Sequence, residues 1–192
     1  MKFSSKKILG VLGLICALAL ATKFIFDLFF ANNVSEKVTW KLATSWDSEF
    51  RPFTDSVANM ARMVEEMSGG DFVIKIDAVN KHKSAFGIMD MVKLGQYQMG
   101  HTASYYYKGR DPVLLLFTSM PFGMNALEQY AWFYFGGGIE LAQTAYKKHG
   151  IYSFPGGNTG VQMGGWFRKE INSLDDLRGL KMRIPGFAGE IF

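Results

Sequence analysis

Residues 38–78 read VTWKLATSWDSEFRPFTDSVANMARMVEEMSGGDFVIKIDA, and this stretch decides the fold. Residues 38–44 alternate between apolar and polar side chains, which predicts a half-buried β-strand. Pro52 then stands where a helix can begin, because the first turn does not need its missing amide hydrogen. One helical face is predicted by apolar residues at spacings of four and three: Phe53, Val57, Met60, Val64 and Met67. Gly69-Gly70 ends that helix, and Asp71–Ala78 has the pattern of a second strand.

The alternation of strands and helices continues after this unit. Further strands are expected at Met99–Ser104, Ile151–Phe154, Val161–Arg168 and Lys181–Ile184. Helices are expected at residues 86–94, Ala126–Phe135 and Ile139–Lys148, and Asn80–Ser84 is expected to be a basic loop. Ser173 and Asp176 have capping-box spacing before a short helical turn. The repeated alternation predicts an α/β fold with a largely parallel sheet.

The N-terminus has the pattern of an export signal. A basic region with Lys2, Lys6 and Lys7 precedes the apolar run Ile8–Ala21, which alone is short for a membrane span. Ala19-Leu20-Ala21 fits the small-x-small pattern of a cleavage site. Because residues 24–30 are still largely apolar, residues 1–31 are either a cleaved signal peptide or an uncleaved anchor. Both predict a periplasmic protein, and the anchor would retain it at the inner membrane.

Charge and cysteine content exclude several functions. The net charge of +4 includes three N-terminal lysines, and 4 − 3 leaves +1, so no basic face for nucleic acid is expected. The single cysteine, Cys16, lies in the N-terminal apolar run, so a mature chain would have no disulfide or thiolate site. The three histidines are scattered, and His101 is expected to be a satisfied strand residue. The sequence contains no phosphate loop, dinucleotide fingerprint or nucleophile elbow.

Arg183 is the strongest candidate for ligand recognition. It stands near the end of an expected strand and is followed by Pro185-Gly186 and a helix start. Ligands of open α/β sheets bind beyond the carboxyl ends of strands. A guanidinium there can give a carboxylate two parallel charge-assisted hydrogen bonds. The alternative is a solvated arginine or a surface ion pair, which contributes little.

Three further polar residues are candidates for the same site. Gln162 and Asn158 flank a glycine-rich loop, and an amide can bond a carboxylate or keto oxygen or give its oxygen to a metal ion. Asn158 can equally bond only its own turn backbone. Tyr105, the first of three consecutive tyrosines, can reach a ligand across a cleft, although alternate tyrosines can also pack inward. Core packing is expected for Trp166-Phe167.

Two strings, FPGGNTGVQMGGWFRKEI at residues 154–171 and GLKMR…GFAG at residues 179–189, resemble the solute-binding proteins of TRAP transporters. The similarity runs from about Val38 to Phe192 and is closest to the 2-oxo-acid-binding branch of this DctP-like family. Such proteins are two-lobed periplasmic receptors that close around a small carboxylate and deliver it to an ion-driven permease. The resemblance implies a type II periplasmic-binding-protein fold. The first α/β lobe would occupy residues 38–154. Residues 155–192 would be the start of a second lobe that is incomplete in this chain.

The resemblance also implies roles for single residues. Arg183 would bind the ligand carboxylate, Gln162 would contact both ligand and metal, and Tyr105 would belong to a first-lobe ligand loop. The branch binds pyruvate-like ligands with a sodium ion, for which calcium is the alternative, and no organic cofactor is implied. The expected partners are the ligand, TRAP permease subunits and a second copy of the full-length protein. No chemistry is expected, so the chain is predicted not to be an enzyme.

Three alternatives stay open. An exported enzyme for small carboxylates would need an acid or base near Arg183, and only Glu190 is close in sequence. A membrane-anchored sensory or interaction module could use the same arginine. Family members continue far beyond the equivalent of Phe192, so the chain is also expected to be a truncated receptor. Such a non-functional fragment is expected to fold poorly or bind weakly.

Overall fold

The computed structural model describes residues 17–26 and 36–191, and the chain divides into the units Met1–Lys37 and Val38–Phe192. In the first unit, residues 17–26 are helical, with exposed apolar side chains such as Leu20 and Phe24. No helix within the described ranges is long and apolar enough to cross a membrane. The rest of the expected signal or anchor, residues 1–16 and 27–31, lies outside the described residues.

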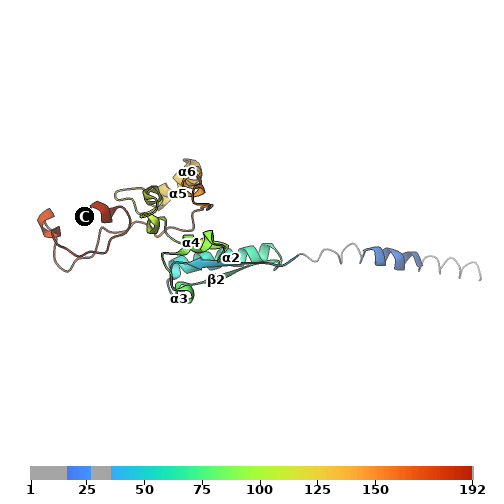
Figure 1. Ribbon diagram of the computed structural model, residues 1–192. Helices are drawn as coiled ribbons and strands as arrows, with labels where there is room; N and C mark the ends of the chain where they lie inside the picture. Colours follow the sequence, from blue (N-terminus) through green and yellow to red (C-terminus); the bar gives the residue numbers. More distant parts are fainter. Residues whose placement is uncertain (1–16, 27–35, 192) are drawn as a thin grey trace, which may run out of the picture. The chain divides into compact units, whose positions relative to one another are not determined.

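A three-stranded parallel sheet organises the start of the second unit (Figure 1). Its strands are β1 (Val38–Thr44), β2 (Phe72–Asp77) and β3 (Met99–His101), in the order β2-β1-β3. β1 pairs with β2 from Val38↔Phe72 to Ala43↔Asp77, and with β3 from Leu42↔Met99 to Thr44↔His101. The parallel sheet and its first two strands are confirmed. The third strand is shorter than predicted, because Ser104 already belongs to a 3₁₀ helix.

Helix α2 (Arg51–Met67) covers this sheet and confirms the predicted helix after β1 (Figure 1). Pro52 lies in its first turn, as expected from its missing amide hydrogen. Val57 is buried with Leu42 and Ile74 of the sheet, and residues later on the same face, among them Met60 and Val64, are partly buried there. The predicted apolar face ends earlier than expected, because Met67 in the last turn is 76% exposed.

Two short helices separate β2 from β3. α3 (Val79–His82) is a single helical turn where a basic loop was predicted, and it ends at Lys83, whose φ of 58° is left-handed. α4 (Ile88–Lys93) confirms the next predicted helix and buries Ile88 and Met89. Ile88 packs against Gly100 of β3 so closely that a Cβ on Gly100 would lie 2.5 Å from Ile88 Cγ2.

This close contact predicts that Gly100→Ala lowers the free energy of unfolding by about 1–3 kcal/mol, because the fully buried Ile88 has little room to move. Urea unfolding measures the change. Gly109→Ala is the matched control, since nothing lies within 4 Å of a Cβ built there. The control is expected to stay within about 0.5 kcal/mol of the original protein. Equal losses in both variants would contradict tight packing of α4 on β3.

A second core forms around two 3₁₀ helices, η1 (Ser104–Tyr107) and η2 (Pro112–Phe117). They lead to α5 (Ala126–Phe135) and α6 (Gly138–Lys147), which confirm two predicted helices. Asn125 and Glu128 exchange hydrogen bonds at the start of α5, which forms a capping box. The buried side chains of this core come from α4, η1, η2 and α6: Met89, Tyr107, Leu114, Phe117, Ala142, Ala145 and Tyr146.

The buried carboxylate of Asp111 ties η2 to the end of α6. It accepts hydrogen bonds from Lys148 Nζ at 2.8 Å, from His149 Nε2 at 3.0 Å and from the Val113 amide at 3.1 Å. The hydrogen bond from Lys148, followed by that from His149, lowers the pKa of Asp111 to about 2. Asp111 therefore carries its charge at neutral pH and holds two segments of this core together.

Three predicted strands do not form: Ile151–Phe154, Val161–Arg168 and Lys181–Ile184 are irregular. Among the described residues, no backbone hydrogen bond joins them to a neighbouring strand. An alternating apolar pattern becomes a strand only where an adjacent strand supplies the ladder of hydrogen bonds. Trp166, which was predicted to pack in the core, is 88% exposed for the same reason, and Phe167 is 40% exposed.

Two local predictions in this C-terminal region are confirmed. The capping box at Ser173 forms, because its amide and its hydroxyl both donate to the Asp176 carboxylate at 3.0 Å. It begins the short η3 (Leu174–Leu177). The helix expected after Gly186 is α7 (Ala188–Ile191). Short-range signals thus hold in this region where long-range strand pairing does not.

Candidate functional site

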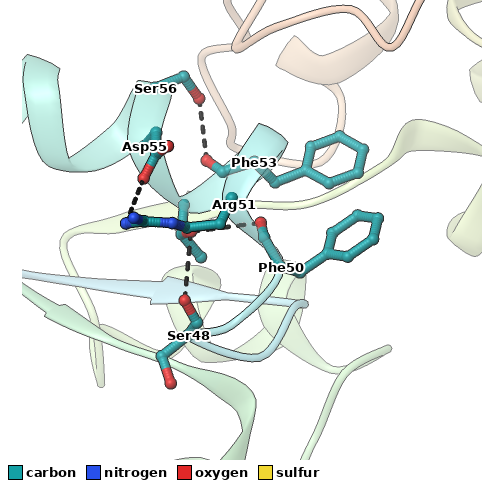
Figure 2. A network of polar contacts seen from close by, with 7 residues as sticks. Ser48, Phe50, Arg51, Phe53, Asp55 and Ser56 are labelled. Carbon is teal, nitrogen blue, oxygen red and sulfur yellow. Dashed lines mark hydrogen bonds and ion pairs between the residues drawn. The ribbon is translucent and has the colours of Figure 1, made fainter.

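A cluster of aromatic side chains lies at the carboxyl ends of β1 and β3. Trp46, just after β1, stacks on Phe53 of α2 with ring centroids 4.1 Å apart and an interplanar angle of 3°. The His101 ring, at the end of β3, lies 4.8 Å from Trp46 and 6.1 Å from Phe53. Figure 2 shows Phe50 and Phe53 projecting to one side of the start of α2, with their rings 5.0 Å apart. These rings line the sheet edge at which α/β proteins bind ligands.

Gly156 crosses this edge, at the boundary between the two predicted lobes. A Cβ on Gly156 would lie 3.1 Å from His101 Cδ2, so a glycine permits the close approach. The Ser56 hydroxyl donates to the Gly156 carbonyl at 3.5 Å, and His101 hydrogen-bonds the Gly156 backbone. Burial lowers the pKa of His101 to about 4, against the opposing effect of that bond. His101 is therefore neutral at pH 7 and satisfied, as predicted.

Hydrogen bonds between hydroxyl groups hold residues 105–107, here called the tyrosine loop, at the same edge of the sheet. Tyr107 is 3% exposed, and its hydroxyl accepts from the Met89 amide and donates to Thr102 Oγ1, both at 3.1 Å. Thr102 Oγ1 is 2.7 Å from Ser45 Oγ, which lies just beyond β1. Ser45 Oγ also donates to the Ala85 carbonyl at 2.6 Å. These bonds connect η1 with the ends of β1 and β3 and with the residues leading into α4.

Arg183 lies beside the tyrosine loop. Burial raises the pKa of Tyr106 to about 12, the hydrogen bond with Tyr105 adds to the rise, and the positive charge of Arg183 opposes it. Gly186 (φ 64°) is buried, and a Cβ on it would lie 2.9 Å from Ser119 Cβ and 3.8 Å from Tyr105 Cβ. The segment that carries Arg183 thus passes near Tyr105 at Gly186. Arg183 is exposed and pairs with no carboxylate within residues 17–26 and 36–191.

Glu190, the acid that follows Arg183 in the sequence, forms an ion pair with Lys108. This pair joins α7 to the residue directly after η1. The geometry thus gives Glu190 a structural partner.

Asn158 and Gln162 have local partners. Asn158 Oδ1 accepts from the Gly160 amide at 2.7 Å, which is the turn contact named as the alternative, and its Nδ2 donates to Gln129. Gln162 Nε2 donates to Thr159 Oγ1 at 3.0 Å. Both side chains are exposed, and among the described residues neither contacts Arg183 or Tyr105. Their contact with a ligand stays a prediction.

A cation site at Gln162 fits the chemistry in part. Sodium and calcium take oxygen ligands, and the Gln162 side chain uses its nitrogen for Thr159, so Oε1 is the atom that can face an ion. Within the described ranges, no three His, Cys, Asp or Glu side chains form a group that could hold a metal ion. Gln162 therefore supplies one suitable oxygen, and the remaining ligands would be neutral oxygens or come from elsewhere.

Sequence reasoning missed several residues at this edge. Tyr106, whose raised pKa the charge of Arg183 opposes, was the alternative to Tyr105, and the choice between them stays a prediction. Trp46 could have been found, because it follows a predicted strand end directly. The roles of Ser45 and Thr102 had no signal, since isolated hydroxyl residues are common in loops.

The chain matches a protein family described as bacterial extracellular solute-binding protein, family 7 (DctP), over residues 42–192. A monocarboxylate 2-oxoacid-binding periplasmic protein from Nostoc sp. is 46% identical over 154 residues, which are 80% of this chain and 42% of that protein.

Two solved structures are also similar. A TRAP periplasmic solute-binding protein from Pseudoalteromonas atlantica with bound sodium and pyruvate is 65% identical, with a TM-score of 0.79 over 81% of this chain and 47% of that one. Another from Colwellia psychrerythraea with bound calcium and pyruvate is 63% identical, with a TM-score of 0.79 over 81% of this chain and 48% of that one. The α/β architecture is therefore that of TRAP periplasmic binding proteins. This chain spans less than half the length of each of these relatives.

Proposed function

Because this chain belongs to the DctP family of bacterial extracellular solute-binding proteins, we propose that it is a TRAP receptor sequence that captures small 2-oxo acids such as pyruvate. The receptor holds its ligand non-covalently outside the cytoplasm. It delivers the ligand to membrane permease subunits and performs no reaction. The exported location rests on the family and on the signal-like N-terminus, whose retention as an anchor is the alternative.

The observation that carries this proposal is Arg183, an exposed guanidinium without a carboxylate partner among the described residues, beside the tyrosine loop. A 2-oxo acid offers a planar carboxylate that can accept two parallel hydrogen bonds from that fork. Support comes from the identities of 65% and 63% to proteins whose structures contain pyruvate. No observation favours a sensory module, and the Lys108 pairing of Glu190 weighs against an enzyme.

Tyrosine hydroxyls would complete the recognition of the ligand. With a pKa of about 12, Tyr106 keeps its proton at neutral pH and can donate to a carboxylate or keto oxygen. We propose Tyr106 and Tyr105 as contacts together with Arg183. Gln162 would give Oε1 to a sodium or calcium ion bound with the ligand, which would neutralise part of the ligand's charge. Asn158 would shape the turn that carries Gln162.

The test is a titration of the chain with pyruvate, followed by NMR or calorimetry. Arg183→Gln is expected to weaken binding at least about 30-fold, since it removes a charge-assisted bidentate contact of about 2 kcal/mol. Arg178→Gln is the matched control, because it removes the same side chain and charge from an exposed arginine whose partner is Asp175 at 2.9 Å. That control is expected to bind as the original chain does.

Two outcomes would contradict the proposal. A folded chain that shows no response to millimolar pyruvate does not recognise this ligand class by itself. Equal weakening by Arg183→Gln and Arg178→Gln would mean that net charge, and not a clamp at Arg183, attracts the anion.

A further inference from the structure

We infer that the Tyr107 hydroxyl is the positioning group of the ligand loop, within a connected set of hydroxyl hydrogen bonds that includes Thr102 and Ser45. The inference rests on the proposed function, since it concerns how the loop that carries Tyr105 and Tyr106 is held. Tyr107 itself is buried in the core.

The chemistry of each group fixes most of the donors in this set. A backbone amide can only donate, so the Met89 N–H is given to the Tyr107 oxygen, and Tyr107 gives its own hydrogen to Thr102. A backbone carbonyl can only accept, so Ser45 gives its single hydrogen to Ala85 at 2.6 Å. The same Ser45 hydroxyl faces Thr102 Oγ1 as a donor at 2.7 Å, so its hydrogen lies between two acceptors. Thr102 Oγ1 accepts from both Tyr107 and Ser45 and joins the two hydroxyls.

The two backbone groups at the ends of this set of hydrogen bonds lie in one segment of the polypeptide. The set starts at the Met89 amide in α4 and ends at the Ala85 carbonyl just before that helix. Between these ends it touches Tyr107 in η1 and the residues that leave β3 and β1. Linked hydroxyls polarise one another, so the loss of one group weakens the others. Three segments at the sheet edge are therefore fixed by a single connected unit.

The unit holds η1 in register with the rest of the site. A 3₁₀ helix has about three residues per turn, so fixing Tyr107 fixes the directions of the two residues before it. Those residues are Tyr105, which packs against Gly186, and Tyr106, on which the charge of Arg183 acts. A second clasp, between Ser104 and Thr118 hydroxyls at 2.8 Å, holds the other end of η1. A tilt of η1 would separate the tyrosines from the guanidinium without unfolding the core.

The experiment separates the effect of the hydroxyl group from the effect of side-chain shape at Thr102. Thr102→Val keeps the shape and removes the hydroxyl, whereas Thr102→Ser keeps the hydroxyl and removes a methyl group. Pyruvate affinity is expected to fall about tenfold in Thr102→Val and in Tyr107→Phe, as is typical when a supporting group behind a ligand contact is lost. Thr102→Ser is expected to restore most of that loss. Ile74→Ala, in the other core and 8% exposed, controls for general destabilisation and is expected to leave affinity unchanged at a temperature where it is folded.

Hydrogen exchange tests the inference independently of the ligand. The Tyr106 amide bonds the Ala103 carbonyl at 3.1 Å, and its exchange is expected to quicken in Tyr107→Phe and Thr102→Val but not in Ile74→Ala. If the original chain does not bind pyruvate but the variants show this exchange pattern, the proposed function fails and the positioning role stands. If Tyr107→Phe keeps both the affinity and the exchange rate, the positioning role is overturned.

Discussion

Leu114→Ala is expected to lower the free energy of unfolding by about 2–5 kcal/mol, which is a large part of the stability of a domain of this size. Leu114 is 0% exposed and lies in η2, among the buried side chains Phe117 and Tyr146. Removal of its isopropyl group leaves a cavity that these rings, already in contact with each other, fill only in part. Urea unfolding followed by tryptophan fluorescence measures the loss, because Trp132 packs on Phe117.

The neighbouring Leu116 provides the control for this result. It belongs to the same short helix and has the same side chain, but it is 42% exposed. Leu116→Ala is expected to change the free energy of unfolding by about 0.5 kcal/mol or less. If the two alanine variants lost equal stability, the result would contradict the burial of Leu114 in the core.

Lowering the pH from 7 to 4 is expected to cost the protein about 3 kcal/mol of stability through His101 alone. The pKa of His101 is about 4 when folded, against an ordinary value of 6.5. Between these values the unfolded chain binds a proton that the folded chain does not, so unfolding becomes more favourable as the pH falls. Stability from this group is complete above pH 6.5 and is lost toward pH 4.

The variant His101→Gln keeps a hydrogen-bond donor near Gly156 and cannot titrate. Its free energy of unfolding is expected to depend less on pH between 7 and 4 than that of the original chain, by about 3 kcal/mol across the window. Asp111 acts in a separate window, because a pKa lowered from 3.8 to about 2 removes its contribution only as the pH falls through that lower range. Identical slopes for the original chain and His101→Gln between pH 7 and 4 would contradict a buried neutral His101.

The sequence predicted the elements whose signals are local. α2 was recognisable from apolar residues at helical spacing, and the Ser173 turn from its capping residues. Strand pairing is a relation between distant segments, and Val161–Arg168 carries a strand pattern without a partner among the described residues. A period of two or 3.6 shows which side chains share a face, but not whether another strand stands beside them.

The candidate site was predictable in its arginine and less so in its tyrosines. Arg183 was singled out because an arginine at an expected strand end, before Pro185-Gly186, is chemically distinctive, and its role in binding stays a prediction. Three adjacent tyrosines cannot be told apart by pattern, and a strand-like alternation would have treated Tyr105 and Tyr107 alike. The 3₁₀ geometry of η1 instead buries Tyr107 and leaves Tyr105 and Tyr106 half-buried near Gly186 and Arg183. The hydrogen bonds of Tyr107 with Met89 and Thr102 depend on tertiary structure, which the local sequence pattern does not show.

The ion pair that joins Lys108 to Glu190 spans 82 positions in the chain. Contacts between such distant residues must close a long loop before they contribute, so they form after the local contacts of the helices. The pair is exposed on both sides and contributes little energy of its own, which makes this closure the weakest step to reverse. Arg183 is therefore expected to separate from the tyrosines under mild denaturant before the two cores unfold. Competence to hold a ligand is expected to disappear while the helical circular dichroism signal is still intact.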